Sequence, residues 1–364
     1  MITSRSLLLG AVFATSLIPG VARSQQRPAR LSRTFRDSSA RIDTARALAL
    51  YVGIRPEELP QGDYAALARA KAVTDSIYTS RLHGIAKFTK VTYRSSDSLD
   101  IPAYLFEPAG SAPAVRHPAM IWVHGGVHGD WNETMLPFVI EAMQRGYVVL
   151  APDYRGSAGY GKAFYNAIDY GGREVDDVLA GADFLRTRPS VDATRLGIMG
   201  WSHGAYITAL AVFRATHPFR SAAAVVPVTN LVFRLSYKGP AYAQDFAAEP
   251  TIGGLPFEKK AEYIARSPLY HVDDLHVPMM VHFATNDSNV DYVEAQQMVD
   301  ALRARKPDLA EVKVYVDPPP GDEGVGHSFS RRVDKVTLLR NDSPEQVDSW
   351  NRTWAFFAKT LAPH

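Results

Sequence analysis

The chain has 364 residues, 46% of them hydrophobic, which is enough for one large α/β domain with a substantial core. It carries 40 Lys and Arg residues against 38 Asp and Glu residues, and the net charge of +2 provides no long-range field to attract nucleic acid or an anionic membrane surface. Cysteine is absent, which excludes a thiol nucleophile, a disulfide framework and a cysteine metal site. We therefore expect a small-molecule or peptide substrate, and any nucleophile must be an oxygen.

Residues 1–24 have the pattern of an export signal. Arg5 precedes an apolar run over residues 7–18, a Pro-Gly break follows, and Ala22 and Ser24 have the spacing that a signal peptidase recognises. An uncleaved membrane anchor is the alternative, but the run is shorter than the roughly 20 residues that a spanning helix needs. We expect cleavage after Ser24 and an exported protein, periplasmic or extracellular, with no membrane span after signal removal.

Residues 25–87 are predicted to form a flexible leader and a helical extension. Residues 25–40 are polar and basic without periodicity, as in a mobile segment. From Ile42 to about Lys87, apolar residues recur three and four apart, which predicts helices. The helical part is too short for a domain of usual size, so we expect it to pack on the domain that begins at residue 88.

From residue 88 onward the pattern is that of strands alternating with helices. A hairpin is predicted over residues 87–108, and short apolar runs occur after it at 119–123, 147–152, 196–200, 222–228, 279–284 and 311–316. Such runs, separated by amphipathic segments, are typical of a parallel sheet covered on both faces. The prediction is an α/β fold over residues 88–364, with a mostly parallel eight-stranded sheet and a lid inserted at about 230–267.

The motif Gly-Trp-Ser-His-Gly, residues 200–204, lies where a predicted strand meets a predicted helix. A sharp strand-to-helix turn forces its central residue into a strained conformation, and the flanking glycines let two backbones pass closely. The turn raises the Ser202 hydroxyl above the carboxyl edge of the sheet and directs the first N–H groups of the helix toward its target. Ser202 is therefore the candidate nucleophile.

A serine nucleophile needs a base, and the base needs an acid to orient it. Asp287 is the first carboxylate after the strand at 279–284, and His327 lies in a Gly-rich loop after the strand at 311–316. Both loops are expected at the same sheet edge as Ser202. Alternatives remain for each residue: Asp287 as a helix cap, although Asp291 fits that role better, His327 as an exposed loop residue, and Asp322 or Glu323 as the acid.

The segment "WVHGGVHGD" provides candidate donors for an oxyanion. The N–H of Gly126, just after a strand, and the N–H of His203, the residue after Ser202, could form a two-donor hole. His124 and His128 are four residues apart, which is also the spacing of a metal pair on a helix. The intervening glycines disfavour a helix, so we expect a structural hydrogen-bonding role for His124 and no metal.

With these residues identified, the chain resembles the catalytic domain of the prolyl oligopeptidase family of serine peptidases, in the α/β-hydrolase superfamily. The resemblance covers about residues 88–362, and its motifs occur in order: "VHGG", "DYRGSAGYG", "REVDDVLAGADFL", "GWSHGA", "VVPVTNLVF", "SPLYHVDDLHVPMMVHFATNDSNV" and "GHSF". The resemblance implies Ser202 as nucleophile, His327 as base and Asp287 as its partner. It also implies Gly126 and His203 as the oxyanion donors.

The chain departs from the family pattern at three points. Val127 stands where the glycine turn usually ends in proline, and "HFATND" is one residue longer than the usual acid-bearing segment. The roughly 45 helical residues before the catalytic domain cannot form the β-propeller that restricts typical members to oligopeptides. The size filter and the exopeptidase anchors of the family are therefore not carried over.

The predicted lid is rich in aromatic residues. Phe233, Tyr237 and Tyr242 are candidates for an acyl or side-chain pocket, and packing of the lid onto the core is the alternative. The overall prediction is an exported serine hydrolase that cleaves peptide or amide bonds through a Ser-His-Asp acyl-enzyme, without a cofactor. The alternatives are a carboxylesterase acting on small esters and a non-catalytic secreted binding protein. The oligomeric state is left open.

Overall fold

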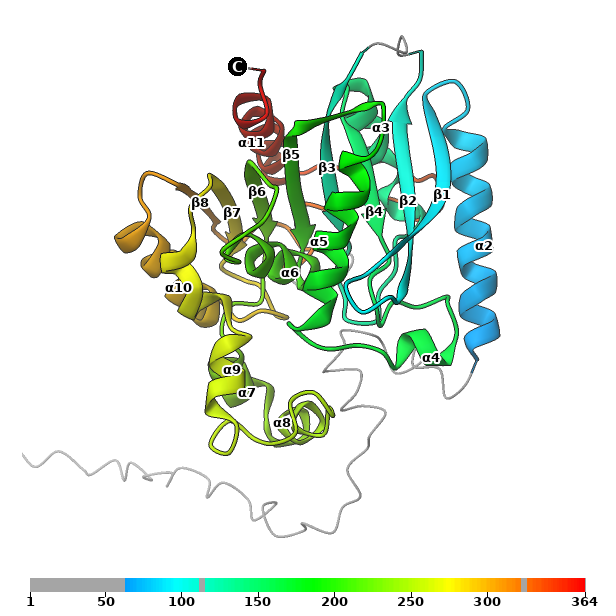
Figure 1. The fold of residues 1–364 in the computed structure, drawn as a ribbon. Coiled ribbons are helices and arrows are strands. Elements are labelled where there is room, and N and C mark those ends of the chain that lie inside the picture. The colour runs from blue at the N-terminus through cyan, green and yellow to red at the C-terminus, as the bar shows by residue number, and fades with distance from the viewer. Residues whose placement is uncertain (1–62, 111–114, 322–325, 364) are drawn as a thin grey trace, which may run out of the picture. The chain divides into compact units, whose positions relative to one another are not determined.

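Eight strands form one sheet, in the order β1-β2-β4-β3-β5-β6-β7-β8 (Figure 1). The computed structural model describes residues 63–110, 115–321 and 326–363. The strands are β1 Ala86–Arg94, β2 Asp100–Pro108, β3 His117–Val123, β4 Val148–Pro152, β5 Val191–Trp201, β6 Ser221–Val225, β7 Met279–Ala284 and β8 Ala310–Tyr315. Every predicted strand is present, so the eight-stranded sheet is confirmed.

The hairpin β1–β2 forms one edge of the sheet, and both β1 with β2 and β2 with β4 pair antiparallel. The other neighbours pair parallel, which brings the carboxyl ends of β3 and of β5 to β8 to one edge. Two strands differ from the predicted ranges: β5 begins earlier, at Val191, and β6 ends earlier, at Val225. Val226 has φ 49°, outside the extended region, and Pro227 has no N–H to continue the ladder.

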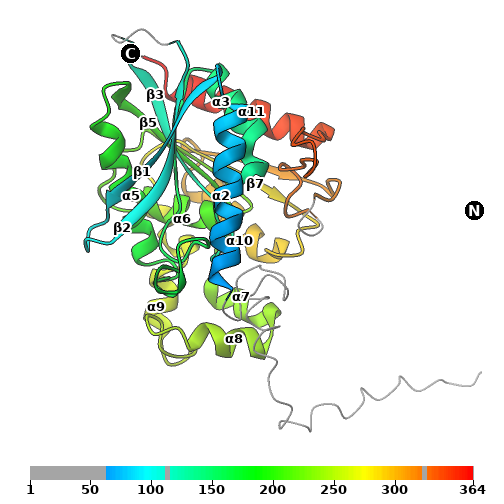
Figure 2. The same ribbon diagram turned by 90° about the vertical axis from the view of Figure 1, so that its right-hand side faces the viewer.

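Helices cover both faces of the sheet (Figure 2). One face packs against α5 Arg173–Arg186, α6 His203–Val212 and α10 Tyr292–Arg305, and the other packs against α3 Leu136–Gln144 and α11 Pro344–Thr360. Helix α10 begins at the cap that the sequence predicts, because the Asp291 carboxylate accepts the N–H of Val293 at 2.8 Å. The helix pattern on both faces is thus confirmed.

Helix α2, Tyr64–Arg81, belongs to the predicted N-terminal extension and packs against the β1–β2 hairpin. The ring of Tyr78 lies 5.6 Å from that of Phe88 and 5.3 Å from that of Phe106, between centroids. The predicted export signal, the leader and the first predicted helix of the extension lie outside the described residues. Within the described residues, no helix is long and apolar enough to span a membrane.

The segment between β6 and β7 contains three short helices, α7 Leu231–Lys238, α8 Pro240–Ala247 and α9 Lys260–Ala265, and the 3-10 helix η4 Pro268–Asp274. Figure 1 shows α7, α8 and α9 gathered beneath the sheet. They occupy the position predicted for the lid. Two further short helices, η3 Glu133–Met135 and α4 Lys162–Tyr165, come after β3 and β4.

Candidate active site

Ser202 lies in the sharp turn between β5 and α6, with φ 52° and ψ −117°. This conformation is costly for a residue with a side chain, so the surrounding structure must impose it. A Cβ at Gly200 would overlap the carbonyl oxygen of Gly204, and a Cβ at Gly204 would overlap that of Val123. The two glycines of the motif are therefore required by close backbone packing, as the sequence predicts.

The structure brings Ser202, His327 and Asp287 together. His327 Nε2 lies 2.9 Å from Ser202 Oγ, and His327 Nδ1 lies 2.8 Å from Asp287 Oδ2. Asp287 and His327 are buried, with 8% and 3% of their surfaces exposed, whereas Ser202 is partly exposed. The hydroxyl is thus reachable from solvent, while the imidazole and the carboxylate are held away from it.

Asp287 also fixes its own loop, because its Oδ1 atom accepts the N–H groups of Asn289 and Val290, each at 2.8 Å. It therefore stabilises a local turn and contacts the imidazole at the same time, while Asp291 caps α10. The competing acids, Asp322 and Glu323, lie outside the described residues.

The loop after β3 passes the serine turn at Gly125, where an added Cβ would lie 3.4 Å from Ser202 Cβ, and Gly126 is the next residue. The carbonyl oxygen of Gly125 lies 3.0 Å from His124 Nδ1, and the N–H of Gly126 points the opposite way because the two groups share one trans peptide. The Gly126 carbonyl accepts the Tyr154 hydroxyl at 2.6 Å, and Gly126 has φ 78°. His203 is the first residue of α6, so its N–H has no acceptor within the helix.

His124 and His128 are each bound to protein groups. His124 Nε2 lies 2.9 Å from the Ser157 hydroxyl, and His128 Nδ1 lies 2.7 Å from the Gly156 carbonyl oxygen. Burial lowers the pKa of His128 to about 4, so its ring is neutral. Among the described residues no group of three or more His, Cys, Asp or Glu side chains is placed to hold a metal ion.

A buried pair lies under the serine turn and was not recognised from the sequence. His203 Nε2 is 2.8 Å from Glu174 Oε1 on α5, and both side chains are within 2% of complete burial. Burial raises the pKa of Glu174 well above its usual value and lowers that of His203 to about 3. Burial thus disfavours the charged form of both groups, and the imidazole of His203 is neutral near pH 7.

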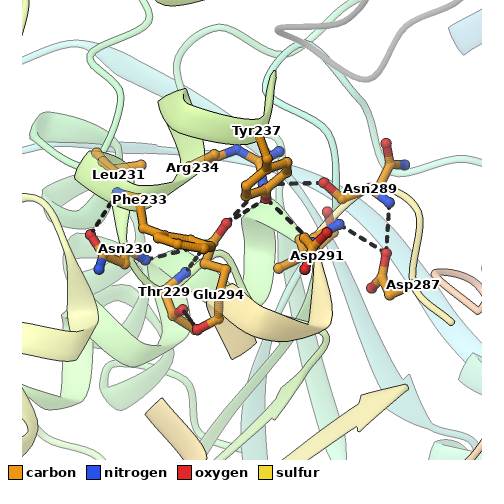
Figure 3. Close-up of polar contacts among 12 residues, drawn as sticks. Thr229, Asn230, Leu231, Phe233, Arg234, Tyr237, Asp287, Asn289, Asp291 and Glu294 are labelled. Atoms are coloured by element: carbon orange, nitrogen blue, oxygen red, sulfur yellow. Dashed lines mark hydrogen bonds and ion pairs between the residues drawn. The ribbon is translucent and has the colours of Figure 1, made fainter. Parts of the chain in front are cut away.

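A second set of polar residues, the lid cluster, consists of Arg234, Tyr237 and Tyr242 of the lid and Glu294 of α10. Figure 3 shows Arg234, Tyr237 and Glu294 of this set. The Tyr237 hydroxyl donates to Glu294 Oε2 at 2.5 Å, and the Arg234 guanidinium lies 3.4 Å from the same oxygen. Arg234 also donates to the hydroxyls of Tyr237 at 2.9 Å and Tyr242 at 3.0 Å. The buried guanidinium therefore has several acceptors, as a buried charge requires.

The lid cluster contacts the loop that carries Asp287 (Figure 3). Arg234 donates to the carbonyl oxygen of Asn289 at 3.2 Å, and the N–H of Asp291 donates to the Tyr237 hydroxyl at 3.3 Å. The main chain of residues 289–291 is thus held from the lid side. Neither Arg234 nor Glu294 was recognised from the sequence, since the pattern of α7 and α10 alone does not show that the two helices meet.

The three residues predicted to line a pocket have different environments in the structure. Tyr242 is completely buried and bound to Arg234, so it packs the lid onto the core, which is the alternative that the sequence left open. Tyr237 is partly exposed, and its hydroxyl is engaged in the lid cluster. Phe233 is partly exposed beside Tyr237, with 5.9 Å between the ring centroids, and stays a candidate for the pocket.

A third set, the extension cluster, consists of Lys71 of α2 and of Asp130 and Asp153 of the sheet domain. Lys71 is only 3% exposed, and its ammonium lies 2.6 Å from Asp153 Oδ2, 3.4 Å from Asp130 Oδ2 and 2.6 Å from the carbonyl oxygen of Trp131. Asp153 in turn accepts the N–H of Trp131 at 2.6 Å. The cluster ties α2 to the segment that continues from Gly126.

The sequence model described as "Prolyl oligopeptidase family" matches residues 134–340, a range that contains Ser202, Asp287 and His327. This match covers more than half of the chain. The chain belongs to the prolyl oligopeptidase family. The resemblance seen in the sequence is thereby confirmed.

Peptidases from other organisms align with the same region. The chain is 29% identical over 225 residues to dipeptidyl aminopeptidase BIII of Pseudoxanthomonas mexicana, covering 59% of this chain and 30% of that protein. It is 24% identical over 217 residues to the human acylamino-acid-releasing enzyme, covering 57% of this chain and 29% of that enzyme. The chain thus spans about a third of the length of these relatives.

Solved structures of peptidases share the fold. The acylaminoacyl peptidase of Pyrococcus horikoshii superposes with a TM-score of 0.62 at 20% sequence identity, covering 79% of this chain and 44% of that one. A puromycin-hydrolyzing peptidase of Mycobacterium tuberculosis superposes with a TM-score of 0.60 at 23% identity, covering 76% and 40%. The predicted α/β-hydrolase fold is therefore confirmed.

Proposed function

We propose that the protein is an exported serine hydrolase that cleaves peptide or amide bonds of small substrates through an acyl-enzyme. The observation that carries the proposal is the pair of contacts at His327, 2.9 Å to the hydroxyl of Ser202 and 2.8 Å to the carboxylate of Asp287. An imidazole placed between a hydroxyl and a carboxylate is the arrangement that activates a serine. The names of the aligned relatives, which are peptidases, favour amide substrates.

In the proposed reaction, Ser202 Oγ attacks the substrate carbonyl carbon while His327 Nε2 takes its proton. Asp287 holds the Nδ1–H tautomer and stabilises the imidazolium that forms. The N–H groups of Gly126 and His203 donate to the oxyanion of the tetrahedral intermediate. His327 then gives the proton to the leaving nitrogen, and a water molecule activated by the same imidazole releases the acyl group.

Export is proposed from residues 1–24, where a basic residue, a short apolar run and small residues at the signal-peptidase spacing come one after another. The test is expression of the full chain with determination of the N-terminal residue of the mature protein. Cleavage after Ser24 is expected, and recovery of only uncleaved, membrane-bound protein would contradict it.

Labelling with a fluorophosphonate probe tests the nucleophile. We expect the parent protein to label, Ser202→Ala to lose labelling, and the matched control Ser236→Ala, at an exposed lid serine, to label like the parent. Undiminished labelling of Ser202→Ala would refute the assignment. Turnover of p-nitrophenyl acetate compared with a panel of aminoacyl p-nitroanilides then separates an esterase from a peptidase, and we expect the anilides to be cleaved.

A further inference from the structure

A cavity of about 420 Å³ opens beside the serine turn. Its wall includes Gly125 and Gly126 of the loop after β3, Trp201 before the nucleophile and Ser328 after the imidazole. Gly125 is in direct contact with the serine turn, because a Cβ placed on it would lie 3.4 Å from Ser202 Cβ. The cavity is thus lined by the residues next in the chain to Ser202 and His327, and its volume is in the range of small-ligand sites.

The position of the cavity indicates which part of a substrate it receives. At the tetrahedral carbon, one substituent is the serine oxygen, one points to the oxyanion donors, and the leaving group points to the base that protonates it. The cavity adjoins the loop of Gly126 and the residue after His327, and no described residue of α7, α8 or α9 lines it. The leaving group therefore lies on the cavity side and the acyl group on the lid side.

Helix α2 of the extension forms part of the cavity wall through Leu67, Ala70 and Thr74. The helix is fixed there by the buried Lys71–Asp153 ion pair and by a hydrogen bond of 2.6 Å from the Thr74 hydroxyl to Glu133. Since α2 is anchored to the same loop that carries Gly126, the wall and the oxyanion loop are held as one unit.

Charges on the cavity wall are balanced. Its acidic side chains are Asp130 and Glu133, and its basic side chains are Arg331 and Lys335. The remaining wall mixes apolar and polar groups. Its apolar and aromatic residues are Leu67, Met135, Trp122, Trp201 and Tyr165, and its uncharged polar residues include Asn132, Thr134 and Ser328. A wall with balanced charges and with the rings of Trp122, Tyr165 and Trp201 suits an uncharged group with an apolar or aromatic side chain better than an anion or a cation.

We propose that this cavity is the leaving-group subsite, that it binds a residue with an apolar or aromatic side chain, and that α2 determines the size it accepts. This inference rests on the proposed function. It assigns to the extension a part in substrate selection, since the residues of α2 complete a site whose other walls come from the sheet domain.

The test compares two variants of the full chain on one helix. Ala70 is solvent-exposed at the cavity wall and Ala72 is exposed on the same helix without lining the cavity, so Ala70→Phe fills the site and Ala72→Phe is the matched control. Two substrates share an acetyl-alanyl group and differ in the leaving group, methanol or phenylalaninamide. Ala70→Phe is expected to lower kcat/KM at least tenfold for the phenylalaninamide substrate and less than twofold for the methyl ester, and Ala72→Phe to change neither.

Acyl transfer gives a second measurement. During turnover of the methyl ester, added phenylalaninamide attacks the acyl-enzyme: its nitrogen forms the new amide bond, the bond to Ser202 Oγ breaks, and His327 passes the amine proton to that oxygen. The parent is expected to show a rate of amide formation that saturates with phenylalaninamide but not with glycinamide. Ala70→Phe should lose this saturation, and Ala72→Phe should retain it.

Equal losses for both substrates, or no loss for either, would overturn the inference. Failure of the proposed function is a different result: the parent would neither label with a fluorophosphonate nor turn over either substrate. In that case the cavity is still tested by titrating phenylalaninamide into the parent protein and measuring its binding by tryptophan fluorescence. Binding that Ala70→Phe weakens at least tenfold supports the subsite, and binding equal in parent and variant refutes it.

Discussion

The two loops beside Ser202 are supported from opposite sides by elements outside the sheet, and the supports differ. The extension cluster uses the ammonium of Lys71, which binds the segment after Gly126 through Asp153. The lid cluster uses the guanidinium of Arg234, which binds the loop after Asp287 through the carbonyl of Asn289. Both cations are at least nine-tenths buried.

The difference reflects the group that each loop must supply. The loop after β3 offers only main-chain N–H groups, so it must be fixed as a whole, and a compact ammonium among carboxylates and a carbonyl achieves this. The other loop must aim a side chain, and the planar guanidinium reaches several acceptors in different directions at once. The ammonium therefore acts on the segment after Gly126 through the carboxylate of Asp153, whereas the guanidinium acts directly on the main chain of the loop that carries Asp287.

Replacement of Asp287 should have the largest effect, because its loop supplies a side chain to the reaction, whereas the loop after β3 supplies only main-chain N–H groups. Asp287→Asn keeps the size of the group but cannot hold the required tautomer of His327, and we expect kcat to fall by about 10⁴. Steady-state kinetics on a p-nitroanilide measures this, with unfolding by urea as the control for stability. A loss of less than tenfold would show that another acid serves His327.

The extension cluster should contribute most to stability. Lys71→Met leaves the carboxylate of Asp153, which is not exposed at all, without its cation, and such a change costs about 3–5 kcal/mol. Lys87→Met is the matched control, because its ion pair with Glu107 lies at the surface and contributes about 0–1 kcal/mol. Denaturant titration gives the free energy of unfolding of each variant, and Lys71→Met should be the less stable of the two. Equal values would show that the extension cluster does not contribute more to stability than a surface ion pair.

A smaller effect is expected from removing one hydroxyl group, that of Tyr237, from the lid cluster. Tyr237→Phe removes the donor to Glu294 and the acceptor for the N–H of Asp291, and a hydrogen bond to a charged group is worth about 1.5–3 kcal/mol. We expect that loss in the free energy of unfolding, and a lower kcat at unchanged KM because the loop of Asp287 loses a contact. Tyr270→Phe, at an exposed tyrosine, should change neither quantity.

The buried pair of Glu174 on α5 and His203 at the start of α6 predicts a pH effect. Burial raises the pKa of Glu174 in the folded protein, so the folded protein keeps this proton to a higher pH than the unfolded chain, which releases it above about pH 4.3. The contribution of Glu174 to stability is therefore lost as the pH rises. Relative to Glu174→Gln, the parent should lose unfolding free energy between pH 5 and pH 7, with a limiting slope of about 1.4 kcal/mol per pH unit.

Denaturant titrations of both proteins at the two pH values measure this difference. If the difference in unfolding free energy between the parent and Glu174→Gln is the same at both pH values, then Glu174 has an ordinary pKa and forms an ion pair with His203.

The sequence predicted the sheet and the approach of Ser202, Asp287 and His327, because strand periodicity and the glycine turn are local signals and parallel strands share one carboxyl edge. It did not predict the three clusters. The partners in each cluster lie on separate elements: Lys71 and Asp153, Arg234 and Glu294, and Glu174 and His203. A helix pattern does not show which charged residue will be buried against which partner. Tyr242 illustrates the same limit, since its aromatic character alone did not distinguish a pocket wall from packing.

The contact between Ser202 and His327 joins positions 125 residues apart in the chain. A ribosome makes the polypeptide from its N-terminus, so the serine turn is translated long before the imidazole that would activate it. A nascent chain that has folded its first strands still has no base for its hydroxyl. The order of synthesis thus places the proposed base after the nucleophile, so a chain that ends before residue 327 has the hydroxyl without the imidazole.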